Sequence, residues 1–216
     1  RIPKGATVHF GILNSLRSWN FYELPDNVTS YSNVGGFGID GGVSTLVGAS
    51  FADKDKLYFG IIGDLAFFYD INVLGNRHVG NNLRILLVNN GKGTEFRQFN
   101  HVASQFGEDA DKFIAAAGHF GNKSPELVKN YAQSLGFEYI SASNKDEFEK
   151  VYERFLMPIL TEKPIIFEVF TNSELESKAL ETITNVKVDL SGVIKKMAQK
   201  ILGQSGVNTL KKISRK

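Results

Sequence analysis

The chain has 216 residues, a hydrophobic content of 42% and a formal net charge of +2, which fits one sizeable domain with its own core. It contains no cysteine, so disulfides and thiolate metal sites are excluded, and we expect a cytoplasmic protein. No apolar run approaches the length of a membrane span. The chain begins with Arg1 and shows no signal-peptide pattern, so we interpret it as a piece of a longer protein.

The charge is unevenly distributed along the chain. From Lys187 to the end there are eight basic residues and one acid, Asp189, so this segment carries about +7 and the rest about −5. The acidic main body therefore gives no reason to expect nucleic-acid binding. The basic segment has apolar residues on one helical face, namely Leu190, Val193, Ile194, Met197, Ala198 and Ile201. We divide the chain into a main domain, residues 1–185, and a basic amphipathic helix and tail, residues 186–216.

Two roles are open for the basic amphipathic helix. Its charged face and apolar face together suit a membrane surface or an acidic partner. We expect instead that it docks on the main domain and leaves its charged face in solvent.

Predicted strands and helices alternate along the main domain. We predict strands at residues 8–11, 28–32, 57–62, 83–88, 138–141 and 165–169. Between and after them we predict helices at residues 14–22, 41–52, 67–74, 109–117, 125–135 and 145–156. Such alternation is typical of a parallel sheet that helices cover on both faces. The fold class predicted is α/β, a three-layer α/β/α sandwich with a mostly parallel central sheet.

Polar side chains follow two of these predicted strands. Gly63 and Asp64 come after the strand at 57–62, and Asn89 and Asn90 close the strand at 83–88. Open α/β sheets place their ligands at the carboxyl ends of the strands. A carboxylate, an amide oxygen and a nearby backbone carbonyl form an all-oxygen set of the kind that Mg²⁺ prefers, with phosphate oxygens and waters completing its shell.

A purely structural interpretation of the same residues is also open. Asp64 is a residue type that caps helix N-termini, and Asn89-Asn90 is typical of a turn after a strand. Taken singly, each residue favours the structural interpretation, whereas the two together at this spacing favour the metal site.

The pattern resembles the cofactor-binding motif of thiamine diphosphate enzymes, in which a Gly-Asp pair is followed at this kind of distance by Asn-Asn. The segments Gly63–Asn72 and Gly35–Gly41 look most like the menaquinone-pathway succinyl-enolpyruvyl-hydroxy-cyclohexene-carboxylate synthases. The resemblance implies that Asp64, Asn90 and the backbone carbonyl of Lys92 bind Mg²⁺. It also implies that the start of the helix after Gly63, at Leu65 and Ala66, presents N–H groups to the cofactor diphosphate.

The glycine-rich segment has a second role by resemblance. Ile39, in the run Phe37-Gly38-Ile39, matches the apolar residue that wedges between the two rings of the cofactor and bends it. The carbonyl of Phe37 would accept a hydrogen bond from the aminopyrimidine. The alternative is that Ile39 is an ordinary core residue.

The resemblance covers only the diphosphate-binding part of such enzymes. In the family, the activating glutamate lies in a separate N-terminal pyrimidine-binding domain, usually of a partner subunit, so we expect the catalytic residue outside this chain and a homodimer or homotetramer. The expected activity is decarboxylation of a 2-oxo acid, with or without carboligation. The alternative is a non-catalytic module retained for assembly or for binding another phosphorylated ligand.

Two positions depart from the menaquinone synthases. Val34 and Trp19 stand where the resemblance leads us to expect substrate-binding arginines, which bind carboxylates bidentately. We therefore expect a different acceptor substrate. Glu95, just past the cofactor loop, is either an acid/base group or, as we expect, a solvated loop residue.

Overall fold

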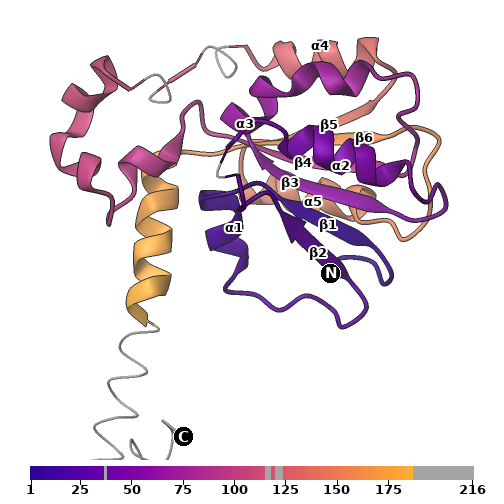
Figure 1. Cartoon of the computed structure of the whole chain (residues 1–216), viewed down its shortest axis with the longest axis horizontal. Helices are drawn as coiled ribbons and strands as arrows, with labels where there is room; N and C mark the ends of the chain where they lie inside the picture. The colour runs from indigo at the N-terminus through magenta and orange to yellow at the C-terminus, as the bar shows by residue number, and fades with distance from the viewer. Residues whose placement is uncertain (37, 115–117, 120–123, 187–216) are drawn as a thin grey trace, which may run out of the picture. The chain divides into compact units, whose positions relative to one another are not determined.

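The structure, a computed structural model, describes residues 1–36, 38–114, 118–119 and 124–186 (Figure 1). Phe37, part of the predicted helix at 109–117, and the predicted basic helix with its tail lie outside these residues. The chain divides into two compact units, Arg1–Leu175 and Glu176–Lys216, and residues 173–186 are helical. The predicted division between residues 185 and 186 stays a prediction. No helix in the described ranges is both long enough and apolar enough to cross a membrane.

A single sheet forms the middle of the first unit (Figure 1). Its order is β2-β1-β3-β4-β6-β5, and every neighbouring pair is parallel. The strands are β1 (Thr7–Phe10), β2 (Thr29–Ser32), β3 (Tyr58–Gly63), β4 (Leu83–Asn89), β5 (Glu138–Ala142) and β6 (Ile165–Phe170). The predicted parallel sheet is confirmed, and every strand lies within a residue or two of its predicted range.

Helices pack on both faces of this sheet. One face is covered by α2 (Gly42–Ser50), α3 (Asp64–Tyr69) with the 3-10 turn η1 (Ile71–Gly75), and α4 (Glu126–Ser134). The other face is covered by α1 (Asn14–Trp19) and α5 (Lys145–Phe155). Each face has its own apolar cluster, because the strands are buried on both sides. The predicted three-layer α/β/α sandwich is confirmed.

The structure corrects the prediction at α3. The helix begins at Asp64, directly after β3, and not at residue 67. Phe67 is consequently fully buried in the apolar cluster under α2 and α4, and it offers no exposed surface for an interface between subunits. Phe68 is half-buried.

Between β4 and α4, the described residues form no α-helix. They form two 3-10 elements, η2 (Thr94–Arg97) and η3 (Val102–Lys112). Gly107 interrupts η3 with φ +53°, a left-handed value that glycine tolerates. Irregular backbone of this kind gives no apolar period, and residues 109–112 of the predicted helix at 109–117 belong to this 3-10 element.

A buried arginine ties β4 to the loop after α5. Arg84 is fully buried and donates hydrogen bonds to the backbone carbonyls of Phe155 (2.7 Å), Met157 (2.5 Å) and Ile159 (2.6 Å). Burial lowers the pKa of its guanidinium to about 10, so the group stays charged at neutral pH. Its plane lies near the ring of Phe59. A single side chain thus fixes the path of the loop that leads into β6.

We predict that Arg84→Met destabilises the chain by about 3 kcal/mol or more, because three carbonyls lose their donors and each costs roughly 1–3 kcal/mol. Methionine keeps most of the volume, so the loss reports the hydrogen bonds and not a cavity. Urea unfolding measures the change. Arg154→Ala is the control, because its ion pair is 41% exposed on the arginine side and exposed pairs contribute about 1 kcal/mol at most. An equal loss in both variants would contradict the prediction.

Candidate functional site

The predicted ligands meet at the carboxyl edge of the sheet. β3 and β4 are neighbours in parallel register, with Gly63 paired to Val88. Asp64 follows the one strand and Asn90 the other, so both residues leave the sheet side by side. β1 and β3 are neighbours in the sheet. The chain goes from β1 to β2 toward one edge of the sheet, and from β3 to β4 toward the other edge. Ligands of open α/β sheets bind where the connections diverge in this way.

Asp64 is the centre of a hydrogen-bond cluster. Its side chain is 3% exposed. Its Oδ2 accepts hydrogen bonds from the backbone N–H groups of Asn90 (3.0 Å) and Gly91 (2.5 Å), and its Oδ1 accepts one from Leu65 (2.8 Å). His119 Nε2 lies 2.9 Å from the same Oδ2. Three backbone N–H groups thus converge on this one carboxyl group.

Asn90 shapes the turn that follows β4. Its Oδ1 accepts a hydrogen bond from the Lys92 N–H (3.0 Å), and its Nδ2 donates to Thr94 Oγ1 (2.9 Å). This side-chain-to-backbone bond is the Asx turn that asparagine favours. The structural interpretation of Asn90 therefore holds, and it brings the Asn90 side chain and the Lys92 backbone together.

The donor atoms suit a small hard cation. Asp64, Asn90 and the Lys92 carbonyl supply oxygens only, and Mg²⁺ commonly takes one or two carboxylates with phosphate oxygens and waters. The described residues hold no group of three histidine, cysteine or acidic side chains placed for a metal. A cation here would thus depend on amide, carbonyl and ligand oxygens, and the residues present fit such a cation. Their assignment as ligands stays a prediction.

The start of α3 differs from what we expected. The Leu65 N–H is already bonded to Asp64 Oδ1, so it is not available to a diphosphate in this conformation. Gly63, the residue before the helix, is extended, with φ −73° and ψ 155°. A diphosphate-binding role for Gly63, Leu65 and Ala66 stays a prediction.

The glycine-rich segment is anchored near α3. Asn33 Nδ2 donates to the Gly41 carbonyl (3.2 Å), and Gly41 has φ +85° at the start of α2. The Ser44 N–H donates to Asp70 Oδ2 (2.6 Å), which ties the start of α2 to the end of α3. Ile39 is half-buried just before this anchor. The cofactor-binding roles of Gly38 and Ile39 stay predictions, and that of Phe37 lies outside the described residues.

Glu95 is not a solvated loop residue. Arg17 donates to it from Nη1 and Nη2, and the Nη2–Oε1 distance is 3.0 Å. The Glu95 side chain is 18% exposed. Beside this pair, Gln98 Nε2 donates to Asn14 Oδ1 (2.5 Å). The two bonds join η2 to α1 at the edge where Asp64 lies. Trp19 packs against Phe10, with ring centroids 5.6 Å apart, as expected of a packing residue.

Sequence reasoning also missed His119. It lies 55 positions after Asp64, and no histidine spacing marks it. Its backbone N–H donates to the Gly91 carbonyl (3.2 Å), and its ring lies 5.1 Å from that of Phe68. His119 thus contacts both the acid and the turn of the candidate site.

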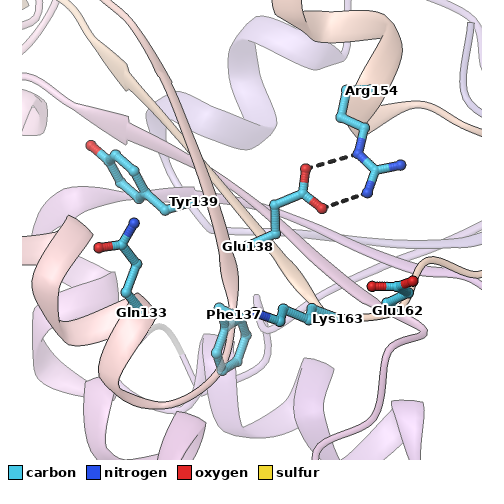
Figure 2. A pocket seen from close by; sticks show the side chains of 7 residues that line it. All are labelled: Gln133, Phe137, Glu138, Tyr139, Arg154, Glu162 and Lys163. Carbon is cyan, nitrogen blue, oxygen red and sulfur yellow. Dashed lines mark hydrogen bonds and ion pairs between the residues drawn. The ribbon is translucent and has the colours of Figure 1, made fainter.

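A pocket opens at the opposite end of the sheet (Figure 2). Arg154 binds Glu138 through two nitrogens (2.8 and 2.6 Å), and this bond lowers the pKa of Glu138. The pocket is lined by Gln133, Phe137, Glu138, Tyr139, Arg154, Glu162 and Lys163. Two acidic and two basic side chains line the pocket. Their charges cancel, so the lining favours neither an anionic nor a cationic ligand. None of the residues predicted to bind the cofactor lines it.

The chain has relatives among curated proteins, although no protein-family model matches it. It is 36% identical over 180 residues to the 2-succinyl-5-enolpyruvyl-6-hydroxy-3-cyclohexene-1-carboxylate synthase of Bacteroides fragilis. It is 33% identical over 172 residues to the synthase of the same name from Desulfotalea psychrophila. The first match covers 83% of this chain and 31% of the relative, so the chain spans about a third of the length of the synthases it matches.

A solved structure shares the fold. The thiamine diphosphate-dependent 4-hydroxybenzoylformate decarboxylase of Rhodococcus jostii RHA1 superposes with a TM-score of 0.55, at 20% identity, over 78% of this chain and 30% of that one. This likeness independently supports the α/β/α architecture. The chain is therefore homologous to part of the 2-succinyl-5-enolpyruvyl-6-hydroxy-3-cyclohexene-1-carboxylate synthases, which it matches over about four fifths of its own length.

Proposed function

We propose that this chain is the C-terminal cofactor-binding domain of an enzyme that uses thiamine diphosphate and Mg²⁺ to decarboxylate a 2-oxo acid, with or without carboligation. The observation that carries the proposal is the contact between Asp64 and the Asn90–Gly91 turn, with N···O distances of 3.0 and 2.5 Å, at the carboxyl ends of neighbouring strands. The solved structure that shares the fold is of a thiamine diphosphate-dependent decarboxylase, which supports the same cofactor.

The residues of this chain would hold the cofactor and its cation. Asp64, Asn90 and the Lys92 carbonyl would bind Mg²⁺, and the cation would neutralise the diphosphate. Ile39 and the segment before it would set the bend of the cofactor. Thiamine diphosphate supplies the electron sink for decarboxylation when it is bound, and the protein positions it.

The rest of the active site would come from outside this chain. The matched synthases are about three times as long as the segment they share with it, since the match covers 31% of the first relative. We propose that the missing part includes the pyrimidine-binding domain with its activating glutamate. We also propose that the full-length protein is cytoplasmic and self-associates.

The acceptor substrate would differ from that of the menaquinone synthases. At the two positions where arginines were expected, Val34 is 51% exposed and Trp19 packs on Phe10. The nearby Arg17 is occupied by Glu95. These three residues therefore offer no unpaired guanidinium for the carboxylates of an acceptor.

We predict that Asp64→Ala in the full-length protein weakens Mg²⁺-dependent binding of thiamine diphosphate by more than about 100-fold, since loss even of a residue that supports a ligand costs roughly 10–100-fold. Without the cation, the diphosphate charges would remain uncompensated in a partly buried cleft. Isothermal calorimetry with Mg²⁺ measures the affinity.

Two further variants separate binding from folding. Asp64→Asn keeps an acceptor for the turn but removes the charge, so it should lose the cofactor and still unfold near the wild-type temperature. Asp55→Ala is the matched control, because Asp55 is exposed before β3, at the opposite edge of the sheet. Wild-type affinity in Asp64→Asn would rule out Asp64 as a metal ligand.

We predict that Ile39→Ala leaves the cofactor affinity within about 5-fold of wild type, because the diphosphate contacts supply most of the binding. Exchange of the proton on the thiazolium carbon should nevertheless slow, since the wedge that bends the cofactor is lost. Hydrogen–deuterium exchange followed by NMR measures that rate. Unchanged exchange in Ile39→Ala would mean that Ile39 is an ordinary packing residue.

We predict that the full-length protein is a homodimer or homotetramer. The family's cofactor lies between two domains that usually belong to different subunits, and such sites are incomplete in one subunit. Light scattering coupled to size exclusion gives the molar mass. A monomer that still turns over a 2-oxo acid would overturn this prediction.

The alternative is a non-catalytic module that binds another phosphorylated ligand or serves assembly. This alternative would be favoured if the N-terminal part of the full-length sequence lacked the activating glutamate. Calorimetry also separates the two, because only the proposed enzyme requires thiamine diphosphate and Mg²⁺ together.

A further inference from the structure

A second carboxyl group is buried beside the candidate site. Glu168 is the fourth residue of β6 and is 1% exposed. It lies opposite Leu87 in the parallel register of β4 and β6, so it faces the apolar cluster that includes Leu87. No predicted ligand or cofactor role involves it.

Both oxygens of Glu168 accept a hydrogen bond. Oε1 accepts from Asn89 Nδ2 (2.6 Å) and Oε2 accepts from the Tyr139 hydroxyl (2.7 Å). Asn89 is itself 1% exposed. Burial raises the pKa of Glu168, while the bonds from Asn89 and Tyr139 act in the opposite direction. Figure 2 shows that Tyr139 and Glu138 leave β5 on opposite sides, so Tyr139 reaches Glu168 on the face away from the Glu138–Arg154 pair.

An apolar residue at position 168 would be buried at a lower cost in free energy than a carboxylate. Burying an ionised carboxylate costs several kcal/mol unless its lone pairs are satisfied, and replacing buried ions with apolar residues is often neutral or stabilising. Glu168 lies on the face of the sheet that carries the apolar residues Leu87 and Ile166. What the carboxyl adds over an apolar side chain is a fixed orientation for Asn89.

Asn89 is the residue before the candidate metal ligand. Its carbonyl accepts from the Thr171 N–H (3.0 Å), and its side chain is held by Glu168. The next two residues, Asn90 and Gly91, donate their N–H groups to Asp64. The turn is therefore held on one side by the start of α3 through Asp64 and on the other by β6 through Glu168.

We propose that Glu168 is a positioning residue for the cofactor loop: through Asn89 it fixes the turn Asn90–Lys92 that carries the proposed cation ligands. The expected effect on cation binding rests on the proposed function. The effect of Glu168 on the turn itself does not depend on the cofactor. Supporting residues of this kind typically change metal affinity by roughly 10–100-fold.

Three variants test the proposal in the full-length protein. Glu168→Leu removes both acceptors and keeps an apolar fit. Glu168→Gln keeps one acceptor for Asn89 and removes the charge. Tyr139→Phe, the matched control, removes the other partner of Glu168 and leaves the bond to Asn89 in place.

The first measurement uses the protein without cofactor. Hydrogen exchange by mass spectrometry follows the peptide that contains the Asn90 and Gly91 amides. We expect exchange about 10-fold faster or more in Glu168→Leu, because the turn opens locally. It should stay near the wild-type rate in Glu168→Gln and Tyr139→Phe, and a peptide across β1 should not change in any variant.

The second measurement is Mn²⁺ affinity in the presence of thiamine diphosphate, by electron paramagnetic resonance. We expect a loss of about 10-fold or more in Glu168→Leu, with substantial recovery in Glu168→Gln. Unchanged exchange in Glu168→Leu overturns the proposal, and so does an equal effect of Tyr139→Phe, which would indicate general core packing. If the wild type binds no Mn²⁺ while the exchange result holds, the proposed function fails and the positioning role of Glu168 stands.

Discussion

The buried carboxylate of Asp64 is the interaction on which the carboxyl edge of this sheet depends. It accepts N–H groups from the turn after β4 and from the first turn of its own helix. Gly91 is buried, and a buried amide without a partner costs roughly 1–3 kcal/mol. One side chain therefore determines both where α3 begins and how the loop after Asn89 leaves the sheet. The same carboxylate is the strongest candidate to bind a cation.

Asp64 is the first residue of α3 and not its N-cap, so the structural interpretation of Asp64 was wrong. For Asn90, the structural and functional interpretations are compatible. Asn90 uses its Oδ1 to form a turn with Lys92, and this turn is what brings the Lys92 backbone beside it. A flexible loop would lose much of its binding energy to ordering before it could hold a cation. Here the loop is already held by Asp64 and by Glu168 through Asn89. Pre-organisation, and not the number of charged ligands, is what this site offers.

The sequence predicted the elements whose apolar pattern is regular. The strands read as continuous apolar runs, as buried parallel strands do, and their carboxyl ends correctly brought Asp64 and Asn90 together. It missed Arg84 and Glu168, which are charged residues inside such runs. Their partners lie far away in the chain, at Phe155 to Ile159 for Arg84 and at Asn89 for Glu168, and no local pattern encodes such contacts. A charge within a buried strand was nevertheless a signal that a specific partner exists.

The two ends of the sheet use buried charge in opposite ways. At the end where β4 begins, the Arg84 cation is surrounded by backbone carbonyls, and its five N–H groups fit several acceptors at once. At the end where β3 stops, the Asp64 anion is surrounded by backbone N–H groups. Arg84 is fully buried, as is expected of a structural role, since its acceptors belong to a single loop. Asp64 instead lies where the strand connections diverge, and its backbone donors come from α3 and from the turn after β4, with His119 Nε2 also 2.9 Å away. Ligands of open α/β sheets bind at the carboxyl ends of the strands, so the functional site is expected at the end where Asp64 lies, although both ends bury a charge.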